Sequence, residues 1–333
     1  MHATVLGGGS WGTALADLLG NTGASVTIWT IEEDVAHQIE SKHENSRYLP
    51  GAALSERIRA TTDIEAALLG AEVILVVVPT PAIRPVMSKA LPYLSDGVPL
   101  ITASKGIENE SLMTCAEILE DVLPEKLHPY LAYVSGPSFA REVAQKQPTA
   151  VTVAAYWPRV AARAQHLLSA PYFRVYTSTD VMGVEIGGAL KNVIAIGAGI
   201  IDGLGLGHNT RAALITRGLA ELTRLGLAKG AHAQTFMGLS GMGDLILTCT
   251  GGLSRNRTVG FELGKGRRLD EILGELGTVA EGVKTTKSAH DLGIKLGVEL
   301  PITDAVHGIL YENKPAPEAV LELMARKSKP EIY

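Results

Sequence analysis

Residues 3–19 read ATVLGGGSWGTALADLL, and this stretch decides the fold of the N-terminal half. Its first four residues have the apolar character of a buried strand, and residues 13–19 have the character of a helix. Between them lies the pattern G-x-G-x-x-G, made by Gly7, Gly9 and Gly12. In this pattern the first glycine permits a tight turn, the second lets the backbone approach a pyrophosphate, and the third lets helix and strand pack closely. Because the N–H groups of the helix start would face the phosphates, we predict a dinucleotide-binding loop rather than a glycine-rich turn without a ligand.

The segments that follow predict the rest of a parallel sheet. A second strand is expected at residues 25–29, where a mononucleotide-binding unit requires one. Residues 73–78, VILVVV, form a continuous apolar run of the type that is buried on both faces of such a sheet. Further strands are expected at residues 100–103, 131–134, 150–155 and 173–176. We therefore predict an α/β fold with an N-terminal, Rossmann-like, doubly wound sheet, whose ligands gather at the carboxyl ends of the strands.

A second stretch, residues 183–217, is long and apolar enough for a membrane span. Its sequence, GVEIGGALKNVIAIGAGIIDGLGLGHNTRAALITR, is interrupted by Glu185, Lys191, Asn192 and Asp202. These residues and the recurring glycines predict one buried helix instead, with no membrane insertion. Lys191 lies on a face of small residues, where another backbone or a flat ring can approach. A functional lysine is expected there, and the alternative is a lysine whose ammonium group reaches water.

Capping residues at positions 178–180 precede this helix and mark the predicted domain boundary. Residues 1–179 are expected to form a dinucleotide-binding domain, and residues 180–333 an all-helical domain for substrate and catalysis. Helices are expected at residues 214–227, 269–276, 284–296 and 316–325, with loops at 239–244 and 251–257.

Two further segments are candidates for binding an anionic ligand. Lys105 follows the strand at residues 100–103 and would lie on the ligand side of the sheet, unless it is a solvated loop lysine. Residues 251–257, GGLSRNR, combine glycines with a hydroxyl, an amide and two guanidinium groups. That set suits a phosphate dianion, and a charged surface turn is the alternative.

The composition excludes several classes of protein. Among 333 residues, 46% are hydrophobic and 20% are charged, as in a globular enzyme rather than a disordered or fibrous chain. A net charge of −5 creates no global field for nucleic acid, so we expect no nucleic-acid partner. Cys115 and Cys249 lie far apart, outside any metal-binding spacing, so no metal is expected. This cysteine usage, and an N-terminus without a signal-peptide pattern, predict a cytoplasmic protein.

Several motifs together resemble one enzyme family. Residues 188–209, GALKNVIAIGAGIIDGLGLGHN, are similar to the signature of NAD(P)-dependent glycerol-3-phosphate dehydrogenase, and no position breaks it. The motifs GGGSWG, VPT, SKGI, SGPSFA, GDL and SRNR also occur in the order found in the family. The resemblance extends over essentially the whole chain and is closer to the bacterial form.

This resemblance implies reversible reduction of dihydroxyacetone phosphate to sn-glycerol 3-phosphate by NAD(P)H, for glycerophospholipid synthesis. It implies Lys191 as the proton donor and acceptor, and Lys105 as a contact of both cofactor and substrate. The other substrate contacts that it implies are Gly136, Ser138, Asp244, Ser254, Arg255 and Asn256. The other cofactor contacts are Ser10, Trp11, Ala140, Arg255, Val279 and Glu281, beside the glycines of the loop.

The chemistry agrees with these roles. Hydride transfer to a ketone leaves an alkoxide, which an ammonium group within hydrogen-bonding reach stabilises and protonates. Burial and a second cation such as Lys105 would lower the pKa of Lys191, whereas pairing with Asp244 would raise it. The sequence leaves open which influence wins, and whether Asp244 is instead a helix cap.

Two other functions fit parts of the sequence. A β-hydroxyacid or 6-phosphogluconate type dehydrogenase shares the two-domain plan and a lysine–asparagine pair on the joining helix. A non-catalytic dinucleotide sensor is less compatible with the chain, because a sensor needs none of Lys191, Lys105 and Asp244.

The cofactor preference and the assembly are less clear from sequence. After the second strand come Thr30, Ile31, Glu32 and Glu33, which fit neither the usual NAD pattern nor the usual NADP pattern. We expect both cofactors to work, with a discrimination of no more than about two orders of magnitude. The oligomeric state stays open, with a homodimer as one candidate.

Overall fold

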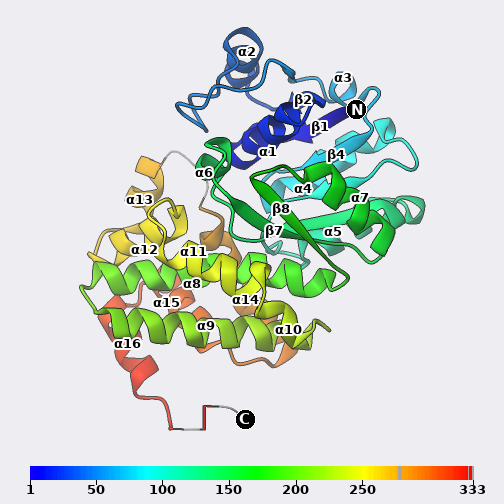
Figure 1. The fold of residues 1–333 in the computed structure, drawn as a ribbon. Helices are drawn as coiled ribbons and strands as arrows, with labels where there is room; N and C mark the ends of the chain where they lie inside the picture. The colour runs from blue at the N-terminus through cyan, green and yellow to red at the C-terminus, as the bar shows by residue number, and fades with distance from the viewer. Residues whose placement is uncertain (277–279, 329, 332–333) are drawn as a thin grey trace.

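A computed structural model describes residues 1–276, 280–328 and 330–331. Its N-terminal half is built on an eight-stranded sheet of order β3-β2-β1-β4-β5-β6-β7-β8 (Figure 1). The strands are β1 (His2–Leu6), β2 (Ser25–Trp29), β3 (Ile58–Thr61), β4 (Val73–Val76), β5 (Leu100–Thr102), β6 (Leu131–Ser135), β7 (Thr149–Ala154) and β8 (Phe173–Ser178). The first six run parallel, whereas β7 pairs antiparallel with β6 and parallel with β8. The predicted α/β class is confirmed, and β3 is a strand that the sequence patterns missed.

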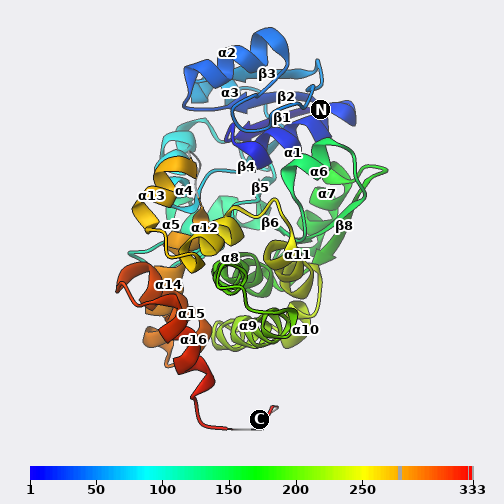
Figure 2. The same cartoon turned by 90° about the vertical axis from the view of Figure 1, so that its left-hand side faces the viewer.

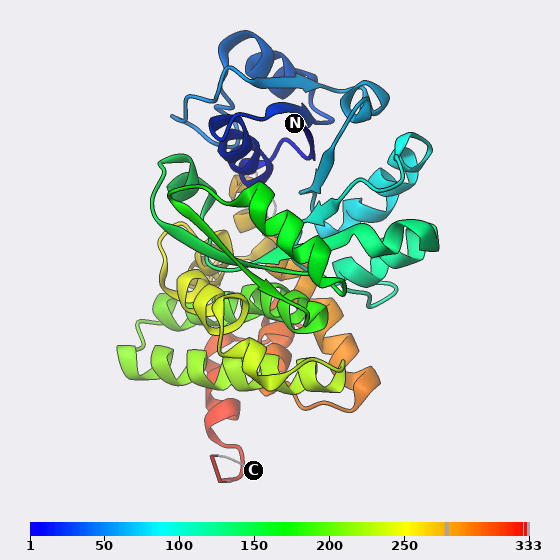
Figure 3. The ribbon, with the colours of Figure 1, turned by 45° about the vertical axis from the view of Figure 1, so that its right-hand side comes forward.

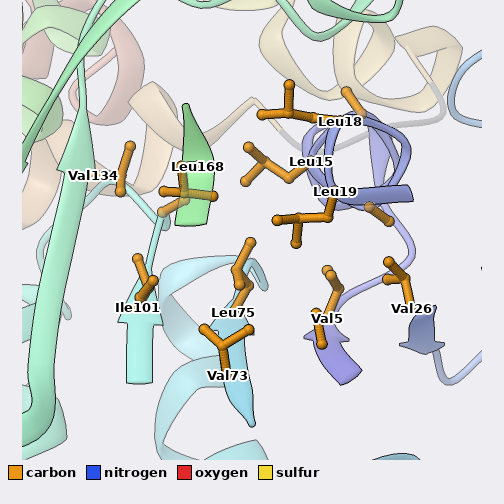
Figure 4. Close-up of a cluster of buried hydrophobic side chains, with 14 of the residues drawn as sticks. Val5, Leu15, Leu18, Leu19, Val26, Val73, Leu75, Ile101, Val134 and Leu168 are labelled. Atoms are coloured by element: carbon orange, nitrogen blue, oxygen red, sulfur yellow. The ribbon is translucent and has the colours of Figure 1, made fainter. Parts of the chain in front are cut away.

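Helices cover both faces of this sheet. They are α1 (Ser10–Asn21), α2 (Glu33–Lys42), α3 (Ile64–Leu68), α4 (Thr80–Ala90), α5 (Cys115–Val122), α6 (Ala140–Ala144) and α7 (Pro158–Leu168), with short 3-10 turns at Leu91–Tyr93 and Glu125–Tyr130. Side chains of β4 alternate between two hydrophobic clusters: Val73 and Leu75 pack with α1 and α7, whereas Ile74 and Val76 pack with α3, α4 and α5. Figure 4 shows the first cluster, and Figure 3 shows α7 lying across β7 and β8. The VILVVV run is therefore apolar at every position because both of its faces are buried.

The C-terminal half is helical and is organised around one buried helix. Its elements are α8 (Val181–Gly203), α9 (His208–Ala228), α10 (Ala233–Phe236), a π-helical turn η3 (Leu239–Gly243), α11 (Asp244–Thr250), α12 (Arg255–Gly264), α13 (Leu269–Leu276), α14 (Glu281–Leu296), α15 (Pro301–Tyr311) and α16 (Ala316–Met324). Figure 2 views α8 nearly end-on, with α9, α11, α12 and α14 around it. Although α8 is long and apolar enough to cross a membrane, its apolar window is wholly buried by the protein, as expected for a core helix.

Two predictions about this half are wrong in detail. Residues 183–217 are not one helix, because the chain turns at 204–207, where Gly205 has a φ of +72°. The segments 239–244 and 251–257 are not simple loops either: the first is mostly the turn η3, and α12 begins at Arg255. The helices α10, α11, α12 and α15 were also missed, since three of them lie in short, glycine-punctuated or polar segments without a clear 3.6-residue period.

A glycine of α8 and a glycine of α12 allow a close contact between the two helices. A Cβ atom on Gly199 would lie 2.0 Å from the carbonyl oxygen of Arg257 on α12. On the other side, a Cβ atom on Gly260 would lie 2.0 Å from the carbonyl oxygen of Ile196. The two backbones therefore touch without side chains between them, which only glycine permits at these positions.

Candidate active site

A cleft of about 890 Å³ runs along the carboxyl edge of the sheet and is closed on its other side by α8, α11, α12 and α14. Most residues that the sequence singled out line this cleft: Gly7, Gly9, Ser10, Trp11, Lys105, Ser138, Ala140, Lys191, Ser254, Arg255, Asn256 and Glu281. Gly12, Gly136 and Asp244 lie directly behind the lining, and Val279 lies outside the described residues. The fold thus brings together residues from the whole length of the chain.

The glycine loop between β1 and α1 has the geometry of a phosphate cradle. Gly7 has a φ of +128°, and a Cβ atom there would lie 2.3 Å from the carbonyl oxygen of Val77. A Cβ atom on Gly12 would lie 2.0 Å from the carbonyl oxygen of Gly7, whereas Gly9 borders open space at the start of α1. Each glycine therefore has the role that the motif predicts, and Gly9 leaves room for a pyrophosphate at the helix N-terminus.

Two lysines share one buried carboxylate on the opposite wall of the cleft. Asp244, in the first turn of α11, accepts a hydrogen bond of 2.7 Å from Lys105 Nζ and another from Lys191 Nζ. Lys191 Nζ also donates to Thr248 Oγ1 at 3.1 Å, and Lys105 Nζ donates to the carbonyl oxygen of Gly136 at 3.1 Å. The Lys191 side chain is thereby fixed at the cleft surface, where 8% of the residue is exposed.

The structure indicates which influence dominates the pKa of Lys191, a point that the sequence left open. Burial lowers the pKa of Lys191 to about 8; Asp244 opposes this shift, and Lys105 adds to it. For Asp244 the balance is reversed: burial alone would raise its pKa, but the ammonium groups of Lys105 and Lys191 hold it below its usual value. Asp244 is therefore a charged partner that orients Lys191, and its side chain caps no helix.

The third side of the cleft is the start of α12. Ser254 caps this helix, since its Oγ accepts from the Arg257 N–H at 3.2 Å. Asn256 is fixed on both sides: its Nδ2 donates to Asn192 Oδ1, and its Oδ1 accepts from the Gly282 N–H, each at 2.9 Å. Of the two guanidinium groups predicted to bind phosphate, only Arg255 lines the cleft.

Arg257 has a structural partner instead. Its Nε and Nη2 donate to Asp202 Oδ2 at 2.9 and 2.7 Å, which ties α12 to the end of α8. Arg255 has no ion pair within the described part of the chain, and the partly buried Glu281 lines the same cleft. Burial raises the pKa of Glu281 to about 7, and the positive charge of Arg255 acts against that shift.

Sequence reasoning missed two members of the site. Thr248 bonds Lys191 and also donates to the carbonyl oxygen of Asp244 at 2.7 Å. Its spacing of four residues from Asp244 would have placed both on one helix face, had that segment been predicted as a helix. Asn192 appeared as an interruption of an apolar run and as the partner of Lys191 in a lysine–asparagine pair, but its hydrogen bond to Asn256 was not predicted.

A pyrophosphate cradle on a doubly wound sheet, facing a buried lysine with a lowered pKa, defines the chain as an NAD(P)-dependent oxidoreductase. The model of the NAD-dependent glycerol-3-phosphate dehydrogenase N-terminus matches residues 2–161, and that of the C-terminus matches residues 180–321. The chain belongs to the NAD-dependent glycerol-3-phosphate dehydrogenase family.

Named relatives match this chain over its full length. A glycerol-3-phosphate dehydrogenase [NAD(P)+] of Myxococcus xanthus is 57% identical, over 100% of this chain and 99% of the relative. One from Citrifermentans bemidjiense is also 57% identical, over 98% of both chains. The crystal structure of glycerol-3-phosphate dehydrogenase from Coxiella burnetii superposes with a TM-score of 0.93 at 39% identity, covering 98% of this chain and 99% of that one.

Proposed function

We propose that the protein catalyses reversible hydride transfer between NAD(P)H and dihydroxyacetone phosphate, and that the sn-glycerol 3-phosphate formed serves glycerophospholipid synthesis. The observation that carries this proposal is the Lys191 ammonium group, which is held by Asp244 and Thr248 at the wall of a cleft. The glycine loop borders one part of the same cleft and Arg255 another. A cofactor, a ketone and a phosphate group would each meet suitable residues there.

Lys191 would supply the proton of the reaction. When bound, NAD(P)H supplies the hydride, which adds to the carbonyl carbon and leaves the electron pair of the C=O bond on oxygen. The Lys191 ammonium donates a proton to that oxygen, and the neutral amine then regains a proton from solvent. A pKa of about 8 for Lys191 suits both directions near neutral pH. Asp244 orients the ammonium group, and Lys105 adds positive charge where the alkoxide forms.

The phosphate group of the substrate would bind at the start of α12. Arg255 brings a guanidinium fork, and the first N–H groups of the helix face the same region. Ser254 and Asn256 keep this helix start in place through their hydrogen bonds. We propose substrate contacts also for Gly136 and Ser138, since Ser138 Oγ and Lys105 Nζ both bond the carbonyl oxygen of Gly136.

The cofactor would lie along the sheet edge. Its pyrophosphate would rest on the loop of Gly7, Gly9 and Gly12, whose open space at Gly9 fits the group. Ser10, Trp11, Ala140 and Glu281 also line the cleft, and Lys105 and Arg255 would touch cofactor as well as substrate. Val279 is kept as a proposed contact on the resemblance alone.

We propose residues 1–179 as the dinucleotide-binding domain and residues 180–333 as the substrate and catalytic domain, since β8 ends at Ser178 and α8 begins at Val181. A cytoplasmic location and a homodimer are proposed likewise. Cell fractionation tests the first, and analytical ultracentrifugation tests the second.

Oxidation of NADH or NADPH, followed by absorbance after addition of dihydroxyacetone phosphate, tests the proposed activity. Matched assays with a β-hydroxyacid and with 6-phosphogluconate, each with the oxidised cofactor, separate the alternative dehydrogenases. Turnover of either of those substrates at a rate above that of glycerol 3-phosphate would overturn the proposal. Binding of NADH without turnover of any of them would point to a sensor.

A further inference from the structure

One carboxylate in the cleft has no part in the mechanism above. Glu32 closely follows β2, which ends at Trp29, and lies 20 positions after Gly12 in the sequence. It lines the same cleft as the glycine loop. Its Oε1 accepts a hydrogen bond of 2.8 Å from the hydroxyl of Tyr48, and its Oε2 accepts one from the hydroxyl of Thr30. Thr30 and Tyr48 also line the cleft, so the carboxylate is fixed at its wall.

The same group is tied to the phosphate cradle. Asn45 is fully buried and donates through Nδ2 to the carbonyl oxygen of Gly8 and to Thr13 Oγ1, both at 2.8 Å. Its Oδ1 accepts from the Tyr48 N–H at 3.2 Å. Tyr48 is thereby held relative to the glycine loop, and Glu32 is held relative to Tyr48. A nucleotide whose pyrophosphate rests on the loop would present its adenosine ribose in a fixed position near Glu32.

The remaining charges near this carboxylate do not neutralise it directly. Arg47 lies over the Tyr48 ring at 5.2 Å, but it is half exposed and pairs with Asp34 at 3.6 Å. Glu33 is exposed in the first turn of α2, and Ile31, where a cation would be needed for a 2′-phosphate, is an exposed apolar residue. Arg141, on α6, is a cation that lines the cleft, and no hydrogen bond or ion pair joins it to Glu32 in the described part of the chain.

We propose that Glu32, held by Thr30 and Tyr48, is the residue that makes the enzyme prefer NADH to NADPH. An ionised carboxylate only accepts hydrogen bonds, and each of its oxygens has a further acceptor site after bonding Tyr48 or Thr30. The ribose 2′-hydroxyl of NADH can donate to that site, whereas the 2′-phosphate of NADPH brings negative charge against it. Burial and the Glu32 carboxylate raise the pKa of Tyr48, which keeps its phenol protonated as a donor.

The inference rests on the proposed function only in taking the cleft as the dinucleotide site. Wild-type kcat/KM should be about tenfold to 100-fold higher with NADH than with NADPH. Glu32→Gln keeps the shape and removes the charge, so kcat/KM for NADPH should rise about tenfold while that for NADH changes little. Glu33→Gln removes the same charge from the neighbouring exposed residue and should leave the ratio unchanged. Tyr48→Phe should raise KM for NADH without changing kcat, as expected for a residue that positions Glu32.

Fluorescence titration with NADH and NADPH, without any second substrate, separates this inference from the catalytic proposal. If the binding ratio shifts in Glu32→Gln and not in Glu33→Gln, Glu32 selects the cofactor even in a protein that does not reduce dihydroxyacetone phosphate. Equal or tighter binding of NADPH by the wild type would overturn the inference, as would equal shifts in the two variants. Thermal unfolding of each variant shows that the comparison concerns folded protein.

Discussion

Replacing Lys191 by methionine should remove most of the turnover and leave the fold intact. The variant keeps a side chain of similar length in the cleft wall but has no proton to donate. Asp244 would not become an unpaired buried carboxylate, because Lys105 Nζ still bonds it at 2.7 Å. Thr248 keeps its hydrogen bond to the Asp244 carbonyl oxygen. The substitution should therefore lower the turnover rate and not disrupt the fold.

The expected decrease in kcat follows from the role of Lys191 as a general acid. Its loss lowers kcat by ~10²–10⁴, which is about 3–5 kcal/mol of activation free energy. The lowered pKa of Lys191 means that folding disfavours its charged form at neutral pH, and this offsets part of the stabilisation that Asp244 loses with one of its two ammonium partners. Steady-state rates measure turnover, NADH fluorescence measures cofactor binding, and thermal unfolding measures stability.

A matched control is Lys229→Met, because that ammonium pairs with Glu117, which is not part of the cleft lining. It should retain wild-type rates. The pH profile adds a second test: ketone reduction needs the ammonium, so its rate should fall as pH rises through about 8, and alcohol oxidation should rise over the same range. Near-normal kcat in Lys191→Met, or an unchanged pH profile, would refute the assignment.

Three further predictions concern the phosphate, the cofactor and the helix contact. Arg255→Ala should weaken use of dihydroxyacetone phosphate by roughly 2–5 kcal/mol in kcat/KM, with dihydroxyacetone equally poor for both proteins; equal proportional losses on the two compounds would exclude Arg255 as the phosphate-binding residue. Ile31→Arg should raise kcat/KM for NADPH selectively, and no change in the NADPH to NADH ratio would show that this turn does not contact the 2′ position. Gly260→Ala should lower the melting temperature strongly, because its Cβ would lie 2.0 Å from the Ile196 carbonyl oxygen, whereas Gly252→Ala, in open space, should not; similar melting temperatures would contradict the close contact.

The sheet was largely predictable from sequence because its strands carry strong signals. β2 has the predicted bounds, and the run that contains β4 is apolar because both faces are covered. β3 was not found, since its four residues include the exposed Arg59 and it lies at the sheet edge. The four residues alternate between apolar and polar, but so short a stretch is a weak strand signal.

The helical half was harder to predict, and so was the arrangement of its charges. Short helices such as α11 are stabilised by packing against α8, which leaves little periodicity in the local sequence. Sequence motifs indicated Lys191, Lys105 and Asp244 separately. That the two lysines share one carboxylate, and that Arg257 is engaged by Asp202, depends on contacts between residues 53 to 139 positions apart. No local pattern encodes such distances.

The glycine contact between α8 and α12 has a consequence for the size of the substrate. Lys191 belongs to α8, and Arg255 begins α12. With the backbones touching at Gly199 and Gly260, the helices have no room to approach further, and the Asp202–Arg257 pair opposes their separation. In the proposed mechanism the distance between the proton donor, Lys191, and the phosphate-binding start of α12 is therefore fixed. A ketone whose carbonyl and phosphate are farther apart should therefore be a poorer substrate, and two glycines that do not line the cleft would limit its length.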